Sequence, residues 1–182
     1  MVDYGEETPS VSAEQGVEEA TVETQAAEVI GESAFEFYKT AEGEEVLEDE
    51  DELVWRQCAP GHFDTSTGKP TLDLFRPNEA DSGMMSGSRK SKTTAERAYK
   101  HRVEVDQKLS KGTWAVSVAE VDKVDARVVD DSANLKPPPA PPPGHVFIDV
   151  RHLKDLDKRE RLRFRSTLLI FANKRGRQFP AP

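Results

Sequence analysis

Residues 112–119 read GTWAVSVA, and their large apolar side chains fall on every second position. The large members are Trp114, Val116 and Val118, and small residues stand between them. A period of two is the repeat of a strand with one buried face, so this stretch predicts a half-buried strand. Gly112 interrupts the element that precedes it.

Other stretches on both sides also have strand character. Three short runs are rich in β-branched and aromatic residues, namely Leu53–Arg56, Arg127–Val129 and His145–Val150. The apolar residues of 72–75 suggest a further strand, which Pro77 would stop because proline lacks the N–H that a strand needs.

Two stretches predict helices. A Thr-x-x-Glu capping box at 93–96 precedes apolar residues at helical spacing, which favours a helix over about 94–109. An Asp-x-x-Glu motif at 157–160 starts a second helical pattern that Gly176 would end. The alternating arginines of 159–165 also fit a strand, but the capping residues favour the helix.

These elements predict an α+β fold, a small mixed or antiparallel sheet with two helices, over residues 53–182. Residues 78–94 are polar and rich in glycine and serine, which predicts an exposed loop. Six prolines in 137–143 predict an extended polyproline insertion. The residues expected to be buried in mutual contact are Trp55, Phe75, Tyr99, Trp114, Val116, Val118, Phe147 and Ile148.

The charge of the chain is divided unequally. Residues 1–52 hold 18 acidic residues and one basic residue, a formal charge of −17, whereas 53–182 hold 16 acidic and 24 basic residues, or +8. Few large apolar residues accompany the acidic run, so little buried area can offset chain entropy. We therefore expect residues 1–52 to form a disordered acidic arm.

Cysteine and histidine usage bounds the chemistry. The single cysteine, Cys58, excludes an internal disulfide and a cysteine zinc cluster, and the four histidines lack metal-ligand spacing. We therefore expect no metal site and assign no cofactor. A secretion signal and a long apolar run are both missing from the sequence, which favours a cytoplasmic location without a membrane partner.

A basic segment ahead of the first predicted helix is a candidate anion site. Its residues are Ser88, Arg89, Lys90, Lys92 and Thr93. Cations and hydroxyls beside a helix N-terminus can bind phosphate or a partner's carboxylates. A solvated mobile loop is the alternative, and composition favours it.

Two segments are candidate partner-binding elements. The aromatic residues Phe35, Phe37 and Tyr38 interrupt the acidic arm, where they would dock on a partner or pack on their own basic domain. Arg159 and Arg163 belong to the stretch 151–177, which holds ten basic residues against three acidic ones. Such a stretch suits nucleic acid, but the acidic arm would compete for it, and the oligomeric state is not encoded in these patterns.

Several short motifs together resemble a group of small uncharacterised bacterial proteins, over about residues 53–150. The motifs are Trp55-Arg56-Gln57, Phe75-Arg76-Pro77, Asp81, Met85-Ser86, the capped helix with Ala95 and Tyr99, Gly112-Thr113-Trp114-Ala115-Val116, and His145 ahead of a strand. The resemblance implies a compact α+β domain and no particular activity.

A second, fainter resemblance is to ADP-ribosyltransferase-like domains. In those domains an arginine, a serine and a glutamate occur in this order along the chain, and Arg56, Ser86 and Glu120 occur in the same order here. The resemblance implies that the three residues would hold NAD and stabilise an oxocarbenium-like transition state. We expect them instead to lie apart.

The sequence as a whole favours a small intracellular protein-binding or regulatory module without an assignable catalytic activity. The acidic arm and the basic C-terminal surface would be its interaction elements. An ADP-ribosyltransferase-like or other nucleotide-handling enzyme is the first alternative, and a nucleic-acid-binding protein is the second.

Overall fold

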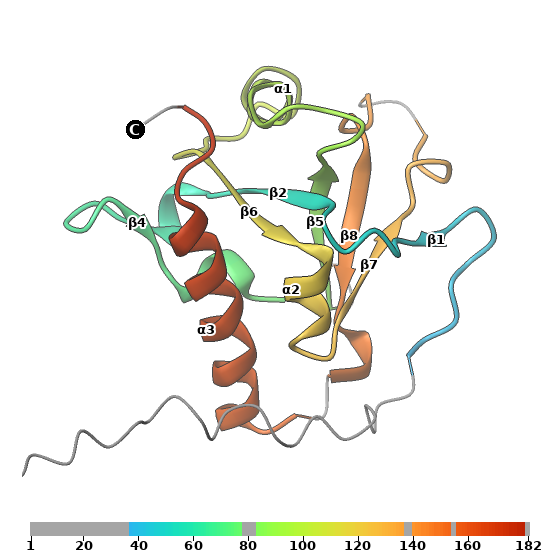
Figure 1. Ribbon diagram of the computed structural model, residues 1–182. Helices are drawn as coiled ribbons and strands as arrows, with labels where there is room; N and C mark the ends of the chain where they lie inside the picture. The colour runs from blue at the N-terminus through green and yellow to red at the C-terminus, as the bar shows by residue number, and fades with distance from the viewer. Residues whose placement is uncertain (1–36, 78–82, 137–139, 154–155, 181–182) are drawn as a thin grey trace, which may run out of the picture. The chain divides into compact units, whose positions relative to one another are not determined.

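The computed structural model describes residues 37–77, 83–136, 140–153 and 156–180, and its centre is a six-stranded sheet with the order β1-β7-β8-β5-β2-β6 (Figure 1). Each neighbouring pair is antiparallel. The strands are β1 (Glu45–Val46), β2 (Leu53–Gln57), β5 (Met84–Arg89), β6 (Thr113–Ser117), β7 (Arg127–Asp130) and β8 (His145–Asp149). A small hairpin pairs β3 (Phe63–Asp64) with β4 (Lys69–Pro70).

Helices cover both faces of the sheet. They are α1 (Ala95–Lys100), its π-helical continuation η4 (His101–Val105), α2 (Val118–Asp122) and α3 (Lys158–Arg175). The 3₁₀ turns are η1 (Pro60–His62), η2 (Leu72–Phe75) and η5 (Arg151–Leu153). The α+β class is confirmed, and the sheet is antiparallel.

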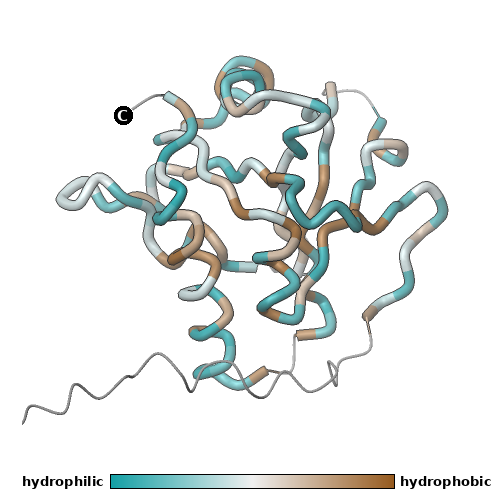
Figure 2. Tube along the Cα trace, viewed as in Figure 1, coloured by the Kyte–Doolittle hydropathy of each residue, from teal (hydrophilic) through white to brown (hydrophobic). Residues whose placement is uncertain are grey.

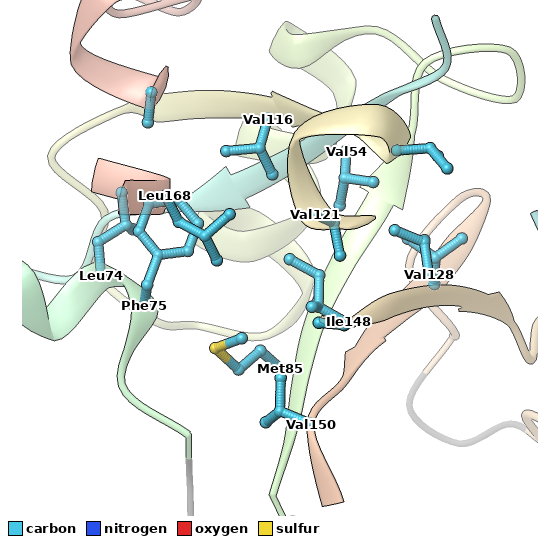
Figure 3. Close-up of a cluster of buried hydrophobic side chains, with 14 of the residues drawn as sticks. Val54, Leu74, Phe75, Met85, Val116, Val121, Val128, Ile148, Val150 and Leu168 are labelled. Carbon is cyan, nitrogen blue, oxygen red and sulfur yellow. The ribbon is translucent and has the colours of Figure 1, made fainter. Parts of the chain in front are cut away.

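The main core lies between the sheet and the layer of α2, α3 and η2. Figure 3 shows Val54, Val116 and Ile148 of the sheet facing Phe75 of η2 and Leu168 of α3. Figure 2 shows brown stretches within these strands and mostly teal first turns of α3, and Phe164, Leu168 and Ala172 of α3 belong to the main core. The apolar side of α3 therefore closes this core.

A smaller cluster on the opposite face changes two expectations. Trp55, Ala98 and Ala115 pack together there, because neighbouring residues of a strand face opposite sides. Residues 113–117 are consequently buried on both faces, so the half-buried prediction for this strand was wrong. Seven of the eight expected core residues are buried, and the eighth, Tyr99, is half-buried. Because Trp55 belongs to this separate cluster, the prediction that all eight residues contact one another was also wrong.

The segment 72–75 is a 3₁₀ turn rather than a strand. The side-chain oxygen of Thr71 accepts a hydrogen bond from the backbone N–H of Asp73 and starts the turn. Leu74 and Phe75, adjacent in sequence, are both fully buried in the main core. A strand would have sent one of them to the other face, so the helical turn buries more apolar area.

The largest correction concerns the predicted loop 78–94, whose residues 84–89 form strand β5. This strand lies inside the sheet between β8 and β2, and Met85 is buried in the main core. Gly87 lets β2 come close: an added Cβ would lie 2.6 Å from Cγ1 of Val54. Small residues with low strand propensity are held here by their neighbours, which local composition does not reveal.

The helix prediction is confirmed at α3, whereas at α1 the structure has a different cap and an earlier end. Asp157 and Glu160 form the expected capping box, and Gly176 follows the last residue of α3, which confirms helix over strand. The cap of α1 is Thr94 rather than Thr93, and its hydroxyl accepts from the N–H of Arg97. Helical structure ends at Val105, ahead of the expected residue 109.

Folded structure begins upstream of Leu53, so the boundary at 52 was too late. Strand β1 pairs with β7. The next residue, Leu47, is buried, and its N–H donates a hydrogen bond to the carbonyl of Val128 at 2.9 Å. Glu52 is also buried and lies 3.6 Å from the Nε of Arg89. The expectations for residues 1–36, including Phe35, and for 137–139 lie outside the described residues.

The C-terminal segment adds two backbone hydrogen bonds to β6. The N–H of Thr113 donates to the carbonyl of Phe179 at 2.7 Å, and the N–H of Gln178 donates to the carbonyl of Thr113 at 2.8 Å. Arg175 also donates to the carbonyl of Ala115 at 3.1 Å. Throughout the described part of the chain, no helix has the length and apolar character required to cross a membrane.

Candidate functional site

A groove of about 880 Å³ opens where β8 passes into η5 and α3 begins. We call it the arginine-rimmed groove. It is lined by Tyr38, Arg76, Pro77, Gly83, Val150, Arg151, Leu153, Leu156, Lys158, Arg161, Leu162, Phe164 and Arg165. Val150, Leu153 and Phe164 are buried, so the floor is apolar, and basic side chains surround it.

The start of α3 determines which of its side chains reach the groove. The Asp157 capping box fixes the first helical turn, so the phase of the helix is set from that residue. Lys158, Arg161, Leu162 and Arg165 follow at intervals of three and four, which places them on one side of the helix. That side carries three cations and one exposed leucine into the groove.

Two of the groove arginines are held by carboxylates. Nη2 of Arg165 lies 2.7 Å from Oδ1 of Asp73, and its Nε donates to the carbonyl of Leu72 at 3.1 Å. Nε of Arg151 lies 2.8 Å from Oδ1 of Asp149, and its guanidinium stands 5.2 Å above the Tyr38 ring. These arginines are fixed in position and form a structured wall.

Asp149 is fully buried and binds a second arginine, Arg127, whose Nη2 lies 3.0 Å from Oδ2. Burial alone would raise the pKa of Asp149, but the hydrogen bonds from Arg151 and Arg127 outweigh it and leave that pKa lowered. The carboxylate of Asp149 is therefore charged at neutral pH, and it orients both arginines.

Three other cations of the groove are available to a ligand. The side chains of Arg76, Lys158 and Arg161 are exposed, and none makes a hydrogen bond or ion pair with another described residue. Cations around an apolar floor suit a ligand that combines carboxylates with an apolar side chain.

The predicted partner-binding residues have different positions. The Phe37 ring lies 4.3 Å from that of His152 and 4.8 Å from the Arg127 guanidinium. Phe37 and Tyr38 therefore pack on their own domain, the second of the two roles considered for them. Arg159 and Arg163 are exposed on α3 but do not line the groove. The helical phase counted from Asp157 would have identified Lys158 and Arg161 instead.

The predicted anion-binding segment is divided between separate environments. Nη1 of Arg89 lies 2.8 Å from Oδ2 of Asp130, and Thr93 is buried beneath the indole of Trp55, whose N–H donates to its carbonyl. Lys90 and Lys92 are exposed on the turn. None of the five residues lines the arginine-rimmed groove, and only Ser88 lines a second hollow described below, so they do not converge on one anion.

The trio Arg56, Ser86 and Glu120 does not form one site. Arg56 donates to the main-chain carbonyls of Ser86 and, at 2.9 Å, of Leu74, so two backbone oxygens hold its guanidinium. Glu120 caps α2 and lies 2.7 Å from Nη1 of Arg175. Burial would raise the pKa of Glu120, but Arg175 and the Ser117 N–H outweigh it and lower that pKa. The glutamate is therefore an internal ion-pair partner on α2.

Arg56 and Ser86 line a second hollow of about 730 Å³, which we call the histidine groove after His62, His101 and His145. Glu120 is not among its lining residues. We expected all three residues to lie apart; this holds for Glu120, but the structure brings Arg56 and Ser86 together in this groove.

The surroundings of Cys58 are unfavourable for a nucleophile. It is fully buried, and burial raises the pKa of its thiol to about 12, so almost no thiolate exists at neutral pH. In the described ranges no three His, Cys, Asp or Glu side chains are grouped so that they would hold a metal ion. Comparisons with family models, curated proteins and solved structures find no significant similarity to this chain.

Proposed function

We propose that this chain is a protein-binding module whose arginine-rimmed groove holds an acidic segment of a partner protein. The observation that carries the proposal is an apolar floor combined with three cations, Arg76, Lys158 and Arg161, whose side chains pair with no other described residue. An apolar side chain of the partner would lie on Val150 and Leu153, and flanking carboxylates would meet the cations. The lone free cysteine supports a cytoplasmic setting for this interaction.

A peptide probe tests the proposal directly. A fluorescein-labelled peptide with acidic residues on both sides of a single leucine is titrated with the intact protein, and fluorescence anisotropy reports binding. The Lys158→Glu/Arg161→Glu variant should bind about tenfold more weakly or worse, because two attractions become repulsions. A peptide with serine in place of leucine should also lose affinity, because the apolar floor then has nothing to bury.

The matched control lies on the same helix. Arg159→Glu/Arg163→Glu changes the same charge on exposed residues of α3 that do not line the groove. This variant should bind the peptide nearly as well as the unmodified protein. Equal losses in both variants would mean that the groove has no special role, and unmeasurable binding to the unmodified protein would overturn the proposal.

Nucleic-acid binding is the second candidate, because Arg159 and Arg163 are exposed and make no ion pair with any other described residue. The same two variants separate it from the first. A duplex RNA or DNA probe that is lost in the Arg159→Glu/Arg163→Glu variant, with a steep dependence on salt, would favour the nucleic-acid function.

A further inference from the structure

The histidine groove forms where two neighbouring strands separate. β2 and β5 pair at only two registered positions, Val54 with Arg89 and Trp55 with Ser88. β5 remains paired with β8 over its first five residues, so β2 is the strand that diverges. The Arg56 guanidinium spans the opening, because it donates to the Ser86 carbonyl on one side and to the Leu74 carbonyl on the other.

The wall opposite the sheet comes from the π-helical turn η4. His101 and Arg102 of this turn and Asp106 and Lys108 just after it line the groove. The turn continues through Gln107, which has a φ of +54°, a conformation that costs energy in a residue with a side chain. π-Helical turns and such backbone strain are frequent at functional sites.

The groove has an excess of positive charge. Its cations are Arg56, Arg76, Arg102 and Lys108, and its carboxylates are Asp73 and Asp106. Asp73 is already paired with Arg165 from outside the groove. Lys108 makes no side-chain hydrogen bond or ion pair with the described residues, and Arg102 comes no closer than 4.0 Å to Asp106. An anionic ligand would therefore satisfy charges that the protein leaves only partly compensated.

His145 gives the groove an oriented ring nitrogen. Its Nδ1 lies 2.5 Å from Oδ1 of Asp131, and because a carboxylate accepts, Nδ1 carries the proton. The other nitrogen, Nε2, then carries a lone pair and bonds to no other described residue, so it can accept a hydrogen bond from a ligand. Ser88 lies directly opposite His145 in the ladder between β5 and β8, so both side chains face the same side of the sheet. A hydroxyl and an imidazole are thus presented together.

We infer that the histidine groove is a binding site for a small organic phosphate. Arg102 and Lys108 from the η4 side would contact the phosphate oxygens, and Nε2 of His145 and the Ser88 hydroxyl would hydrogen-bond the ligand from the sheet side. A volume of about 730 Å³ suits a ligand of nucleotide size. This site is separate from the proposed peptide groove, although Arg76 and Pro77 border both.

The test uses ADP and inorganic pyrophosphate as probes on the intact protein, with isothermal titration calorimetry as the measurement. We expect saturable one-site binding of ADP that weakens about tenfold or more in the Arg102→Gln/Lys108→Gln variant. The single variant Lys108→Glu changes an exposed side chain, so it should fold even if the double variant does not. It should also weaken ADP binding. Pyrophosphate should compete with ADP for the same site.

Lys90→Gln/Lys92→Gln is the matched control, because it removes two cations from an exposed turn that does not line the groove. Its ADP affinity should equal that of the unmodified protein. Absence of saturable ADP binding at millimolar concentration, or equal losses in the control and in the groove variants, would overturn the inference. The Lys158→Glu/Arg161→Glu variant should bind ADP normally, so this result is independent of the peptide proposal.

Discussion

The buried carboxylate of Asp149 connects three segments of the chain. It binds Arg127 of β7 and Arg151 of η5, and these arginines stack on Phe37 and Tyr38. Asp149→Asn removes the charge and keeps the shape, which leaves two largely enclosed guanidinium groups without their counterion. We expect the free energy of unfolding to fall by about 3 kcal/mol.

Urea denaturation followed by tryptophan fluorescence measures that loss. Glu96→Gln is the control, because it removes an exposed carboxylate that lies 2.7 Å from Lys100 on the outside of α1. Solvent screens that pair, so its loss should leave stability unchanged. A similar effect of both substitutions would show that Asp149 does not hold its segments together.

Two half-buried histidines predict how stability depends on pH. Burial lowers the pKa of His152 and of His62, so the folded protein binds their protons less readily than the unfolded chain. Their contribution is complete above the unfolded pKa of about 6.5 and is lost as the pH falls below it. The thermal unfolding temperature should therefore decrease between pH 7.5 and pH 5.5.

Scanning calorimetry across this range checks the prediction, and a His62→Gln/His152→Gln variant should show a flatter profile. A second decrease should follow below about pH 4, because the pKa values of Asp149 and Asp130 are lowered in the folded state. A stability that rises as the pH falls from 7.5 to 5.5 would contradict the assignment of neutral, half-buried histidines.

At the scale of elements, Gly87 controls how closely β2 and β5 approach. A Cβ at this position would lie 2.6 Å from Cγ1 of Val54 and 3.1 Å from the carbonyl oxygen of Trp55. Gly87→Ala should therefore push the strands apart and destabilise the protein by about 1–3 kcal/mol. Chemical denaturation of the variant measures the change.

Gly61→Ala provides the comparison, because an added Cβ at that position meets no atom within 4 Å. It should leave the unfolding midpoint nearly unchanged. If Gly87→Ala were as harmless as Gly61→Ala, the close contact between β2 and β5 would not exist in solution.

The sequence predicts an element well when the residues that determine it lie within the element itself, and poorly when distant segments determine it. The strand at 113–117 and the helix α3 carry their own patterns and capping residues, so local reasoning finds them. β5 consists mainly of methionine, serine and glycine, and only its neighbours on both sides make it a strand. Burial on both faces of β6 likewise depends on α1, whose docking no pattern within 113–117 encodes.

The residues of the candidate site can likewise be predicted from the sequence only in part. The basic character of α3 is evident in the sequence, but the choice of Lys158 and Arg161 over Arg159 and Arg163 requires the helical phase and the position of η5. Arg76 comes from a distant turn, and tertiary structure alone brings it to the groove. The histidine groove depends on the separation of β2 from β5, which no local motif predicts.

At the scale of the whole molecule, residues 37–52 belong to the fold. Leu47 is buried in the main core, β1 pairs with β7, and Glu52 lies against Arg89. Removal of residues 1–52 should therefore lower the free energy of unfolding by about 2 kcal/mol or more, because the burial of Leu47 and the partner of β7 are both lost.

Removal of residues 1–32 is the matched comparison, because it leaves every described residue, from Phe37 onward, in place. This shorter truncation should keep the stability of the intact chain in thermal and urea denaturation. Equal stability of both truncated proteins would mean that the pairing of β1 with β7 contributes nothing to the fold.

The two outer strands of the sheet have a consequence for self-association. An unpaired strand edge offers N–H and C=O groups to other chains, and proteins avoid aggregation by shortening, charging or covering such edges. Here β1 has only two residues and one is Glu45, whereas the far side of β6 is covered where Thr113 bonds to Gln178 and Phe179. Loss of the last few residues would uncover β6, so a chain shortened after Gly176 should form oligomers through edge-to-edge pairing as its concentration rises.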